Sequence, residues 1–443
     1  MTRAPTLESL RAAGRSPRVA AVTLQSFSSG VPLGLVWILL PAFLAYRHVD
    51  IKTIGLFSLV QAPWNFKFLW APLMDRYSLP WLGRKRSWIL VSQLLLLLGT
   101  LGLAASVRAR SLGTLAGFAA FVAFASASQD IAIDAYAVEI LEPAEQGLAV
   151  GARVAVYRLA MYVAGALAIT AGASWGFPWV IGGLALLFLP MMGVVAASPE
   201  PARPPSPPRT LREAVLEPLA GIFRMRRAVE ILAFVLLYKL GENLATSLTR
   251  PFLIEKGFSP ADVGVATATL GLAAMLAGTL AGGVAADRLG LGHALWISGL
   301  LQAAGCLGYA AVDRLGGPLG PSLLDAHRLV MYGAVTVEAS FQGMAAGALG
   351  VLLLRLTARS FSATQFALFT SLFALGRVAV GPAAGWLAGT LGWTPFFFST
   401  VVACVPGLVM LQRFAPLGAA DPPIEPAELE PPSPGLSPAG GGS

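Results

Sequence analysis

The sequence has too little charge for a water-soluble protein of its length. Only 12% of its 443 residues are Asp, Glu, Lys or Arg, whereas 56% are hydrophobic. Soluble globular proteins carry about 25% charged residues, because their surfaces must face water. The composition therefore excludes a single soluble core and predicts an integral membrane protein.

Patterns that carry chemistry in other protein classes are also missing. The two cysteines lie in apolar runs without a CxxC pattern, and the three histidines lie in separate connections. This spacing predicts neither a disulfide nor a clustered metal site. No lysine follows a glycine, so there is no Walker A loop, and HExxH and GxSxG are absent. We expect no enzymatic activity and no cofactor, so energy for uphill movement would come from an ion gradient.

Long apolar runs occupy most of the chain. About 20 helical residues cross the roughly 30 Å hydrocarbon core of a bilayer. The run that follows the basic N-terminus is too long for a signal peptide and is predicted to be a retained first helix. The sequence predicts twelve spans, at 19–45, 53–75, 87–107, 112–141, 147–173, 178–197, 229–254, 261–287, 293–312, 326–356, 363–390 and 393–413.

A polar, Pro-rich and basic linker divides these spans into two groups of six. Part of this linker has the pattern of an amphipathic surface helix that ends in Arg224, Arg226 and Arg227. The final segment is rich in Pro, Gly and Ser, which is typical of disorder. We predict a cytoplasmic segment at 1–18, an N-terminal bundle at 19–197, a cytoplasmic linker at 198–228, a C-terminal bundle at 229–413 and a disordered cytoplasmic tail at 414–443.

The positive charges indicate topology. The net charge is +8, but Arg and Lys lie mainly in short gaps between apolar runs, which argues against a nucleic-acid-binding face. If the N-terminus is cytoplasmic, most of these cations also fall on the cytoplasmic side, as the positive-inside rule requires. We therefore expect both termini in the cytoplasm and the lipid bilayer, not nucleic acid, as the partner.

The two halves of the chain resemble each other. Near-constant offsets of 209 to 219 residues relate the pairs Asp75 and Asp287, Gln129 and Gln342, Gly55 and Gly264, and Arg158 and Arg377. Such offsets predict two six-helix bundles related by an axis along the membrane normal, the arrangement of major facilitator transporters. The Asp-Arg pairs with the nearby basic run resemble the signature loop of that superfamily, which makes Asp75, Arg76, Arg84, Asp287 and Arg288 candidates for a gating loop.

Ionisable residues inside a span are costly unless they face a cavity or a partner, so they indicate function. In the fourth span, Asp130 and Asp134 are four residues apart and share a helical face beside Gln129. They are candidates for proton coupling. The alternative is that they form structural ion pairs with Arg153 or Arg158 in the next span.

The remaining intramembrane charges lie in four other spans. In the seventh, Lys239 and Glu242 either neutralise each other or, with Asn243, line a cavity for a sugar acid or a peptide carboxylate. In the second, Lys67 lies among aromatic residues such as Trp64, of the kind that stack on sugars. Lys67 either binds substrate or pairs with Asp130 or Glu338. Glu338 and Arg377, in the tenth and eleventh spans, are each a candidate half of an interhelical pair.

Four long strings of residues resemble the AmpG-type muropeptide permeases. They are FKFLWAPLMDRY at 66–77, SASQDI at 126–131, YKLG at 238–241 and SFSATQFAL at 360–368. The resemblance implies proton-driven import of N-acetylglucosaminyl-1,6-anhydro-N-acetylmuramic acid and its peptides across the bacterial cytoplasmic membrane. These fragments are recycled from the cell wall and feed the signal that induces β-lactamase. The resemblance also implies that Lys67, Gln129, Asp130, Lys239, Glu242 and Gln365 line a central cavity.

These considerations yield one expected function and two alternatives. The expected function is a monomeric, proton-driven importer of anhydromuropeptides. The alternatives are a transporter of acetyl-CoA or another polar metabolite, and a membrane sensor or scaffold that transports nothing. The candidate substrate-binding residues are Lys67, Trp64, Gln129, Lys239, Asn243, Gln365 and Arg377, and the candidates for proton coupling are Asp130, Asp134, Glu242 and Glu338.

Overall fold

A computed structural model describes residues 15–49, 57–79, 82–109, 111–201, 207–224, 227–320, 322 and 325–418. Most of the predicted N-terminal segment and the tail beyond residue 418 lie outside the described residues. Within these ranges the chain is helical and no strand occurs. The predicted all-α fold class is therefore confirmed.

Most of the predicted spans consist of one or more consecutive helical segments. The α-helices are α2 (Pro17–Leu33), α3 (Leu40–Tyr46), α5 (Ala62–Phe66), α6 (Ala71–Arg76), α7 (Arg84–Ala109), α8 (Leu112–Ile140), α9 (Gln146–Tyr162), α10 (Ala168–Trp175), α11 (Phe177–Leu186), α12 (Phe188–Ala197), α13 (Leu211–Arg224), α14 (Ala228–Leu237), α15 (Leu240–Glu255), α16 (Pro260–Gly264), α17 (Gly271–Leu289), α18 (Leu291–Gly305), α19 (Leu307–Leu315), α20 (Ala326–Leu356), α21 (Ser362–Leu391) and α22 (Trp393–Phe414). Short 3₁₀ segments lie at Ser58–Gln61, Lys67–Leu69 and Arg359–Phe361, and π-helical segments lie at Gly34–Leu39, Val163–Leu167 and Val265–Leu270.

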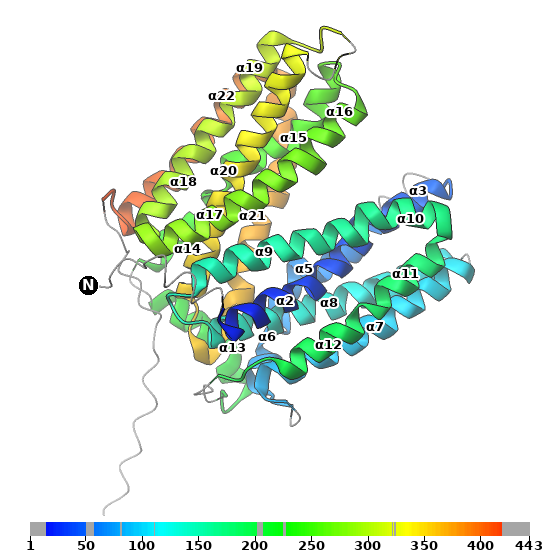
Figure 1. The fold of residues 1–443 in the computed structure, drawn as a ribbon. Helices are drawn as coiled ribbons and strands as arrows, with labels where there is room; N and C mark the ends of the chain where they lie inside the picture. Colours follow the sequence, from blue (N-terminus) through cyan, green and yellow to red (C-terminus); the bar gives the residue numbers. More distant parts are fainter. Residues whose placement is uncertain are drawn as a thin grey trace, which may run out of the picture.

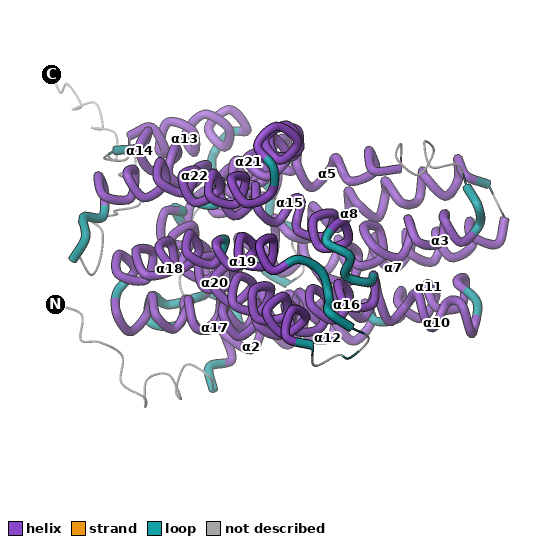
Figure 2. Tube along the Cα trace, turned by 90° about the horizontal axis from the view of Figure 1, so that it is seen from above, coloured by secondary structure: helices purple, strands orange, loops and turns teal. Residues whose placement is uncertain are grey.

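The helices form two bundles that diverge from one end of the molecule (Figure 1). In the first, α2 packs on α9 and α7 packs on α8, and in the second, α17 packs on α20 and α14 packs on α22. The bundles contact each other through α9 with α17 and through α6 and α8 with α21. We call the end that carries α6 the closed end. The opposite ends, marked by α10 and α16, lie apart (Figures 1 and 2).

Among the described residues, nine helical stretches are long and apolar enough to cross a membrane. The predicted spans at 53–75, 229–254 and 363–390 are not among them. Residues 51–56 lie outside the described part of the second span, and the rest of it is broken by 3₁₀ turns. The seventh is broken between α14 and α15, and several side chains of α21 are not described. The total of twelve remains a prediction.

The second and the seventh span each have a break at an intramembrane lysine. Lys67 begins a 3₁₀ turn between α5 and α6, and Lys239 separates α14 from α15 with φ −101° and ψ 8°. A break frees backbone groups from the helical ladder, which bilayers tolerate only where protein or a cavity covers them. Both lysines are indeed buried, so each break lies inside its bundle.

Glycines permit the closest contact between the bundles. A Cβ on Gly283 of α17 would lie 2.1 Å from the carbonyl oxygen of Gly147 in α9, and a Cβ on Gly147 would lie 2.1 Å from the Gly283 carbonyl oxygen. Gly151, one turn further along α9, would place its Cβ 2.8 Å from the Leu280 Cα. A side chain at any of these three positions would hold α9 and α17 apart. The closed end therefore requires glycine there.

Candidate functional site

Asp75, at the end of α6, joins the two bundles at the closed end. Its fully buried carboxylate accepts hydrogen bonds from the backbone N–H groups of Ala363 (3.1 Å) and Thr364 (2.8 Å), and from the Thr364 hydroxyl (2.7 Å). These groups belong to the first turn of α21 in the other bundle. A helix N-terminus carries unpaired N–H groups and a partial positive charge, so it attracts a carboxylate. Lys85 Nζ, at 2.7 Å, neutralises Asp75 from within its own bundle.

Glu139, at the end of α8, makes a parallel contact. Its Oε1 lies 2.6 Å from Arg84 and accepts a hydrogen bond from the Ser362 hydroxyl at 2.6 Å. Lys85 also lies within 3.7 Å. The two acids, Asp75 and Glu139, thus hold the same first turn of α21 while their cations remain in the N-terminal bundle.

Asp287 repeats this arrangement in the opposite direction. It lies near the end of α17 and accepts hydrogen bonds from the backbone N–H groups of Gly147 (3.1 Å) and Leu148 (3.2 Å), in the first turn of α9. Each bundle therefore presents one aspartate to a helix N-terminus of the other. Of the five predicted gating-loop residues, three make contacts at the closed end and two do not. Asp75, Arg84 and Asp287 take part in the closed end, whereas Arg76 lies over the Tyr77 ring and Arg288 is exposed.

The predicted intramembrane charges of the N-terminal bundle form one cluster. Lys67 Nζ lies 3.5 Å from Asp134 Oδ2, and Arg153 of α9 pairs with the other oxygen of Asp134. Asp134 therefore has two cationic partners, which corresponds to the structural alternative that the sequence left open.

Asp130 differs from Asp134, one turn away on α8. Its carboxylate accepts a hydrogen bond from the Ser29 hydroxyl of α2, and among the described residues no Lys, Arg or His forms an ion pair with it. Burying a carboxylate costs less when a cation neutralises it or when it takes up a proton. Of the two, Asp130 is thus better suited to exchanging a proton.

Gln129 and Trp64, two predicted substrate-binding residues, lie inside the N-terminal bundle. Gln129 is fully buried and donates to the Ser28 hydroxyl at 3.0 Å, and Trp64 packs edge-on against Trp37 with ring centroids 6.0 Å apart. In this conformation Gln129 connects α8 to α2. A neighbouring contact, from Trp70 Nε1 to the Ser128 hydroxyl at 3.1 Å, connects the second span to α8.

Lys239 and Glu242 form an ion pair in the C-terminal bundle. Lys239 also donates to Gln302 Oε1 at 2.9 Å and to the Gln342 carbonyl at 3.1 Å, and Gln342 donates to Glu242 at 2.5 Å. Three helices, α15, α18 and α20, thus converge on the break at Lys239. The adjacent Asn243 is buried in the first turn of α15.

Glu338 of α20 is buried and has a neutral partner. Tyr309 of α19 donates its hydroxyl to Glu338 Oε2 at 3.2 Å, and no described cation forms an ion pair with this carboxylate. The sequence proposed Glu338 as a partner of Lys67, but Lys67 pairs with Asp134. Glu338 therefore resembles Asp130 in its surroundings.

Two predicted substrate-binding residues lie in α21. Gln365 is buried at the closed end, where its Oε1 accepts from the Ala358 N–H at 2.7 Å and its Nε2 donates to the Pro218 carbonyl at 3.2 Å. Both polar atoms of its side chain are therefore bound to backbone groups in this conformation. Arg377 lies in the helix, but its side chain is outside the described residues.

Several residues at these clusters were not candidate sites in the sequence. Ser29, Gln302 and Gln342 bind the charged groups, and no charge of their own marks them. Arg158 of α9 is another residue that was not a candidate site, and its Nε lacks a hydrogen-bond partner among the described residues. The sequence had indicated Arg158 only as an alternative ion-pair partner of Asp130 or Asp134 and as the counterpart of Arg377 in the repeat.

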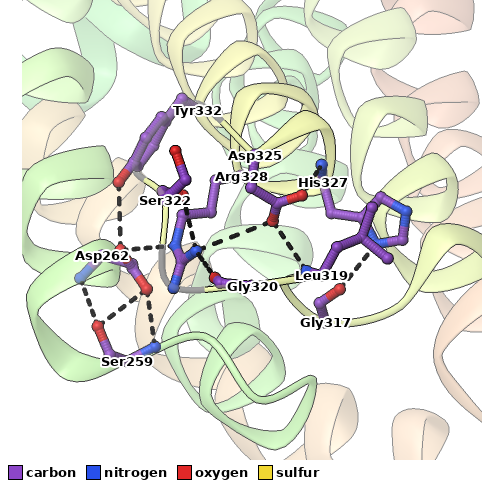
Figure 3. Close-up of polar contacts among 10 residues, drawn as sticks. All are labelled: Ser259, Asp262, Gly317, Leu319, Gly320, Ser322, Asp325, His327, Arg328 and Tyr332. Carbon is purple, nitrogen blue, oxygen red and sulfur yellow. Dashed lines mark hydrogen bonds and ion pairs between the residues drawn. The ribbon is translucent and has the colours of Figure 1, made fainter.

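A separate polar cluster lies at the outer end of the C-terminal bundle, away from the closed end (Figure 3). Arg328 lies 3.1 Å from Asp262 and donates to the Ser322 carbonyl at 2.9 Å. Burial alone would raise the pKa of Asp325 in this loop, but hydrogen bonds from the backbone N–H groups of Leu319, His327 and Arg328 lower it below its usual value. These contacts lie within one bundle and join the α19–α20 loop to α16.

Comparisons with known proteins agree with this architecture. The sequence profile of the Major Facilitator Superfamily matches residues 22–324. The anhydromuropeptide permease of Escherichia coli (strain K12) is 42% identical over 402 residues, which are 90% of this chain and 79% of that protein. A putative transporter of Rickettsia felis, AmpG 4, is 27% identical over 89% of this chain and 96% of its own length.

Solved structures show the same fold. FucP in its outward conformation superposes with a TM-score of 0.68 at 13% identity, over 89% of this chain and 98% of that chain. The proton:xylose symporter XylE gives a TM-score of 0.68 at 12% identity, over 93% and 98%. The profile covers more than half of the chain, and the E. coli relative matches nearly all of it. The chain therefore belongs to the Major Facilitator Superfamily, among its AmpG-type permeases, and is a multi-pass secondary transporter rather than an enzyme.

Proposed function

We propose that this protein imports anhydromuropeptides, namely N-acetylglucosaminyl-1,6-anhydro-N-acetylmuramic acid and its peptide-bearing forms, and that proton entry drives the import. The observation that carries this proposal is the 42% identity, over 90% of this chain, to the anhydromuropeptide permease of E. coli. The sequence strings at 66–77 and 360–368 supply residues at the closed end, and those at 126–131 and 238–241 supply charged residues in the spans.

The intramembrane cations suit the chemistry of this substrate. Muramic acid and its peptide carry carboxylates, which require a cationic partner when they leave water. Lys67 and Lys239 each lie at a helix break inside a bundle, and the Nε of Arg158 in α9 has no hydrogen-bond partner among the described residues. We propose that substrate carboxylates compete with Asp134 and Glu242 for these cations. Binding would then loosen the internal ion pairs of both bundles.

Asp130 and Glu338 are the proposed proton carriers. Each is an acid inside a bundle, bound to a hydroxyl group and without an ion pair among the described residues. In contrast, Asp134 and Glu242 are held by cations. A carboxylate without a cation gains more from protonation when it is buried. The proposal therefore divides the four predicted carboxylates into two proton carriers and two ion-pair partners.

The closed end provides the barrier that must open during transport. Asp75, Glu139 and Asp287 bind helix N-termini of the opposite bundle, so the bundles separate here only when these bonds break. Rocking of the two bundles about a central site is the general mechanism of this architecture. We propose that this conformation faces outward and that substrate and proton together favour opening of the closed end.

We propose that the closed end faces the cytoplasm of a bacterium, so that both termini are cytoplasmic. The positive-inside rule supports this orientation, because the linker at 198–228 and the first turn of α7, with Arg84, Lys85 and Arg86, lie at this end. We also propose that a monomer suffices for transport, because each chain contains both bundles with their buried acids and lysines.

Transport by the purified protein tests this proposal. Proteoliposomes would receive an imposed inward proton gradient and radiolabelled anhydro-disaccharide, with and without a protonophore. Accumulation above equilibrium that the protonophore abolishes is the expected result. Equilibration without accumulation would contradict proton coupling. Absence of both accumulation and counterflow would favour a sensor or scaffold, and uptake of acetyl-CoA instead would identify the alternative substrate.

A further inference from the structure

The linker helix α13 stabilises its own N-terminus. The Thr210 hydroxyl accepts from the Glu213 N–H at 3.0 Å, and Glu213 Oε2 accepts from the Arg209 N–H at 2.8 Å. Such reciprocal bonds resemble a capping box and satisfy N–H groups that a helix start leaves unpaired. The helix is therefore specified locally, in addition to its packing on α6 and α21.

Three different faces run along α13. At 3.6 residues per turn, the residues buried against the bundles share one face: Ala214, Pro218, Gly221 and Ile222. The next face is apolar but exposed, with Val215, Leu216, Leu219 and Phe223, of which Phe223 is 66% exposed. A third face carries Glu213, Glu217 and Arg224. The exposed apolar face is thus adjacent to the buried one rather than opposite to it.

Arg212 lies within the exposed apolar face, between the directions of Leu219 and Phe223 on the helix. Arg224, in contrast, lies on the third face and is 3.6 Å from Glu217. An arginine among apolar side chains at a membrane surface extends its charged end toward phosphate while its stem stays in the apolar layer. The two arginines of one helix therefore have different surroundings.

The charge of this segment fits an anionic membrane surface. Residues 203–227 contain six arginines and two glutamates. Basic amphipathic helices with an apolar face lie in the interface of the bilayer and are attracted by anionic lipids of the cytoplasmic leaflet. Given the proposed orientation, α13 lies at that leaflet, beside the span ends formed by α6, α14 and α21.

We propose that α13 docks into the cytoplasmic leaflet on anionic phospholipid, with Arg212 binding the headgroup phosphate, and that this docking stabilises the closed end. The connection runs through Gln365, whose Nε2 donates to the Pro218 carbonyl of α13. Gln365 follows Thr364, which binds Asp75 across the bundles. Anchoring α13 in lipid therefore restrains the first turn of α21. This inference rests on the proposed orientation but not on the identity of the substrate.

Quenching by spin-labelled lipid tests the position of the helix. Both native cysteines, Cys306 and Cys404, are buried, so Phe223→Cys introduces an exposed site for a fluorophore, and Glu217→Cys on the third face is the matched control. In proteoliposomes of the full-length protein, we expect strong quenching at position 223 and weak quenching at position 217. Equal quenching at both sites, or none at 223, would overturn the proposal; the latter result would favour a soluble protein as the partner of this face.

Headgroup dependence tests the role of Arg212. Quenching at position 223 is compared in phosphatidylcholine vesicles with and without phosphatidylglycerol, for Arg212→Gln and for Arg224→Gln as its control. We expect phosphatidylglycerol to increase quenching in the parent protein and in Arg224→Gln, but not in Arg212→Gln. The same response in both variants would contradict headgroup binding by Arg212. Neither measurement requires transport, so failure to transport anhydromuropeptide would leave this inference intact.

Restraint of the closed end is tested separately. With a fluorescent thiol reagent at Thr364→Cys, which the closed end buries, we expect faster labelling in phosphatidylcholine than in vesicles with phosphatidylglycerol. Arg212→Gln should remove this difference and Arg224→Gln should retain it. Labelling that is independent of the headgroup would show that α13 docking does not act on α21.

Discussion

Asp75 accepts a hydrogen bond from the backbone N–H of Thr364 at 2.8 Å, across the boundary between the two bundles. The two residues are 289 positions apart in the chain. Asp287 makes the equivalent contact with Gly147 at 3.1 Å in the opposite direction. The conformation described here is thus held at one end by a pair of carboxylates on helix N-termini.

Replacing Asp75 with Asn tests this attachment. Asn keeps the size of the side chain but removes the charge that binds Lys85 and the α21 N-terminus. A hydrogen bond to a charged group contributes about 1.5–3 kcal/mol, so the closed state should lose roughly tenfold or more in population. Thiol labelling at Thr364→Cys should be faster in the protein that also carries Asp75→Asn than in the protein that does not.

Asp287→Asn should have a similar effect through α9, and the double variant should open further than either single one. Glu255→Gln, an exposed acid at the C-terminal end of α15, is the charge-matched control and should not change access at position 364. Equal labelling rates in the parent, the two single Asp→Asn variants and the double variant would mean that these carboxylates do not hold the closed end.

The glycine contact between α9 and α17 gives a steric prediction. In Gly283→Ala the new methyl group would lie 2.1 Å from a backbone oxygen, which no side-chain movement relieves. We expect the closed end to fail to close and uptake to fall severely, while the protein still reaches the membrane. Gly193→Ala on α12, where no atom lies within 4 Å of the new Cβ, should transport normally. Full activity of Gly283→Ala would show that transport does not require this contact.

Asp130 and Asp134 should respond differently to the same substitution. Asp130→Asn keeps a partner for Ser29 and leaves no buried cation without its ion pair. We expect it to retain counterflow but to lose accumulation driven by a proton gradient. Asp134→Asn leaves Lys67 and Arg153 without their carboxylate, so its membrane level and melting temperature should fall. Proton-driven accumulation by Asp130→Asn at the parent's level would exclude Asp130 as a proton carrier and leave Glu338 alone in that role.

The Lys239 and Glu242 pair combines stability with binding. Removing one partner of a buried ion pair commonly costs about 3–5 kcal/mol, because the other charge stays buried alone. Lys239→Ala and Glu242→Gln should therefore both lower thermal stability. Lys239→Ala, which removes the cation proposed to bind a substrate carboxylate, should also abolish substrate-dependent stabilisation. The double variant Lys239→Met with Glu242→Leu should recover stability but not substrate binding. Recovery of both would assign the pair a purely structural role.

The sequence predicted the class of the fold because hydrophobicity and charge count are averages over long segments. It also located Lys67, Asp134, Lys239 and Glu242 correctly as charged residues buried within helical bundles. The choice between ion pairing and substrate binding depended on which side chain of a distant helix lies within a few ångströms, as with Arg153 and Asp134. Residue spacing along one helix contains no such information.

Hydropathy did not predict the breaks in the second and seventh spans. Lys67 lies between Phe66 and Phe68, and Lys239 lies between Tyr238 and Leu240, so an average over a long window does not locate the end of the helix. Gln365 illustrates a second limit. Resemblance implied a cavity residue, whereas the structure places its amide between Ala358 and Pro218 at the closed end. A family motif indicates that a residue matters, but not in which conformation.

The most direct test of alternating access is the distance between the bundles at the closed end during transport. Spin labels at Ala144→Cys and Leu289→Cys, both exposed there, would be measured in proteoliposomes by double electron–electron resonance. We predict that anhydro-disaccharide at low external pH creates a longer-distance population, and that Asp130→Asn reduces it. A single short distance that persists while counterflow proceeds would contradict the account.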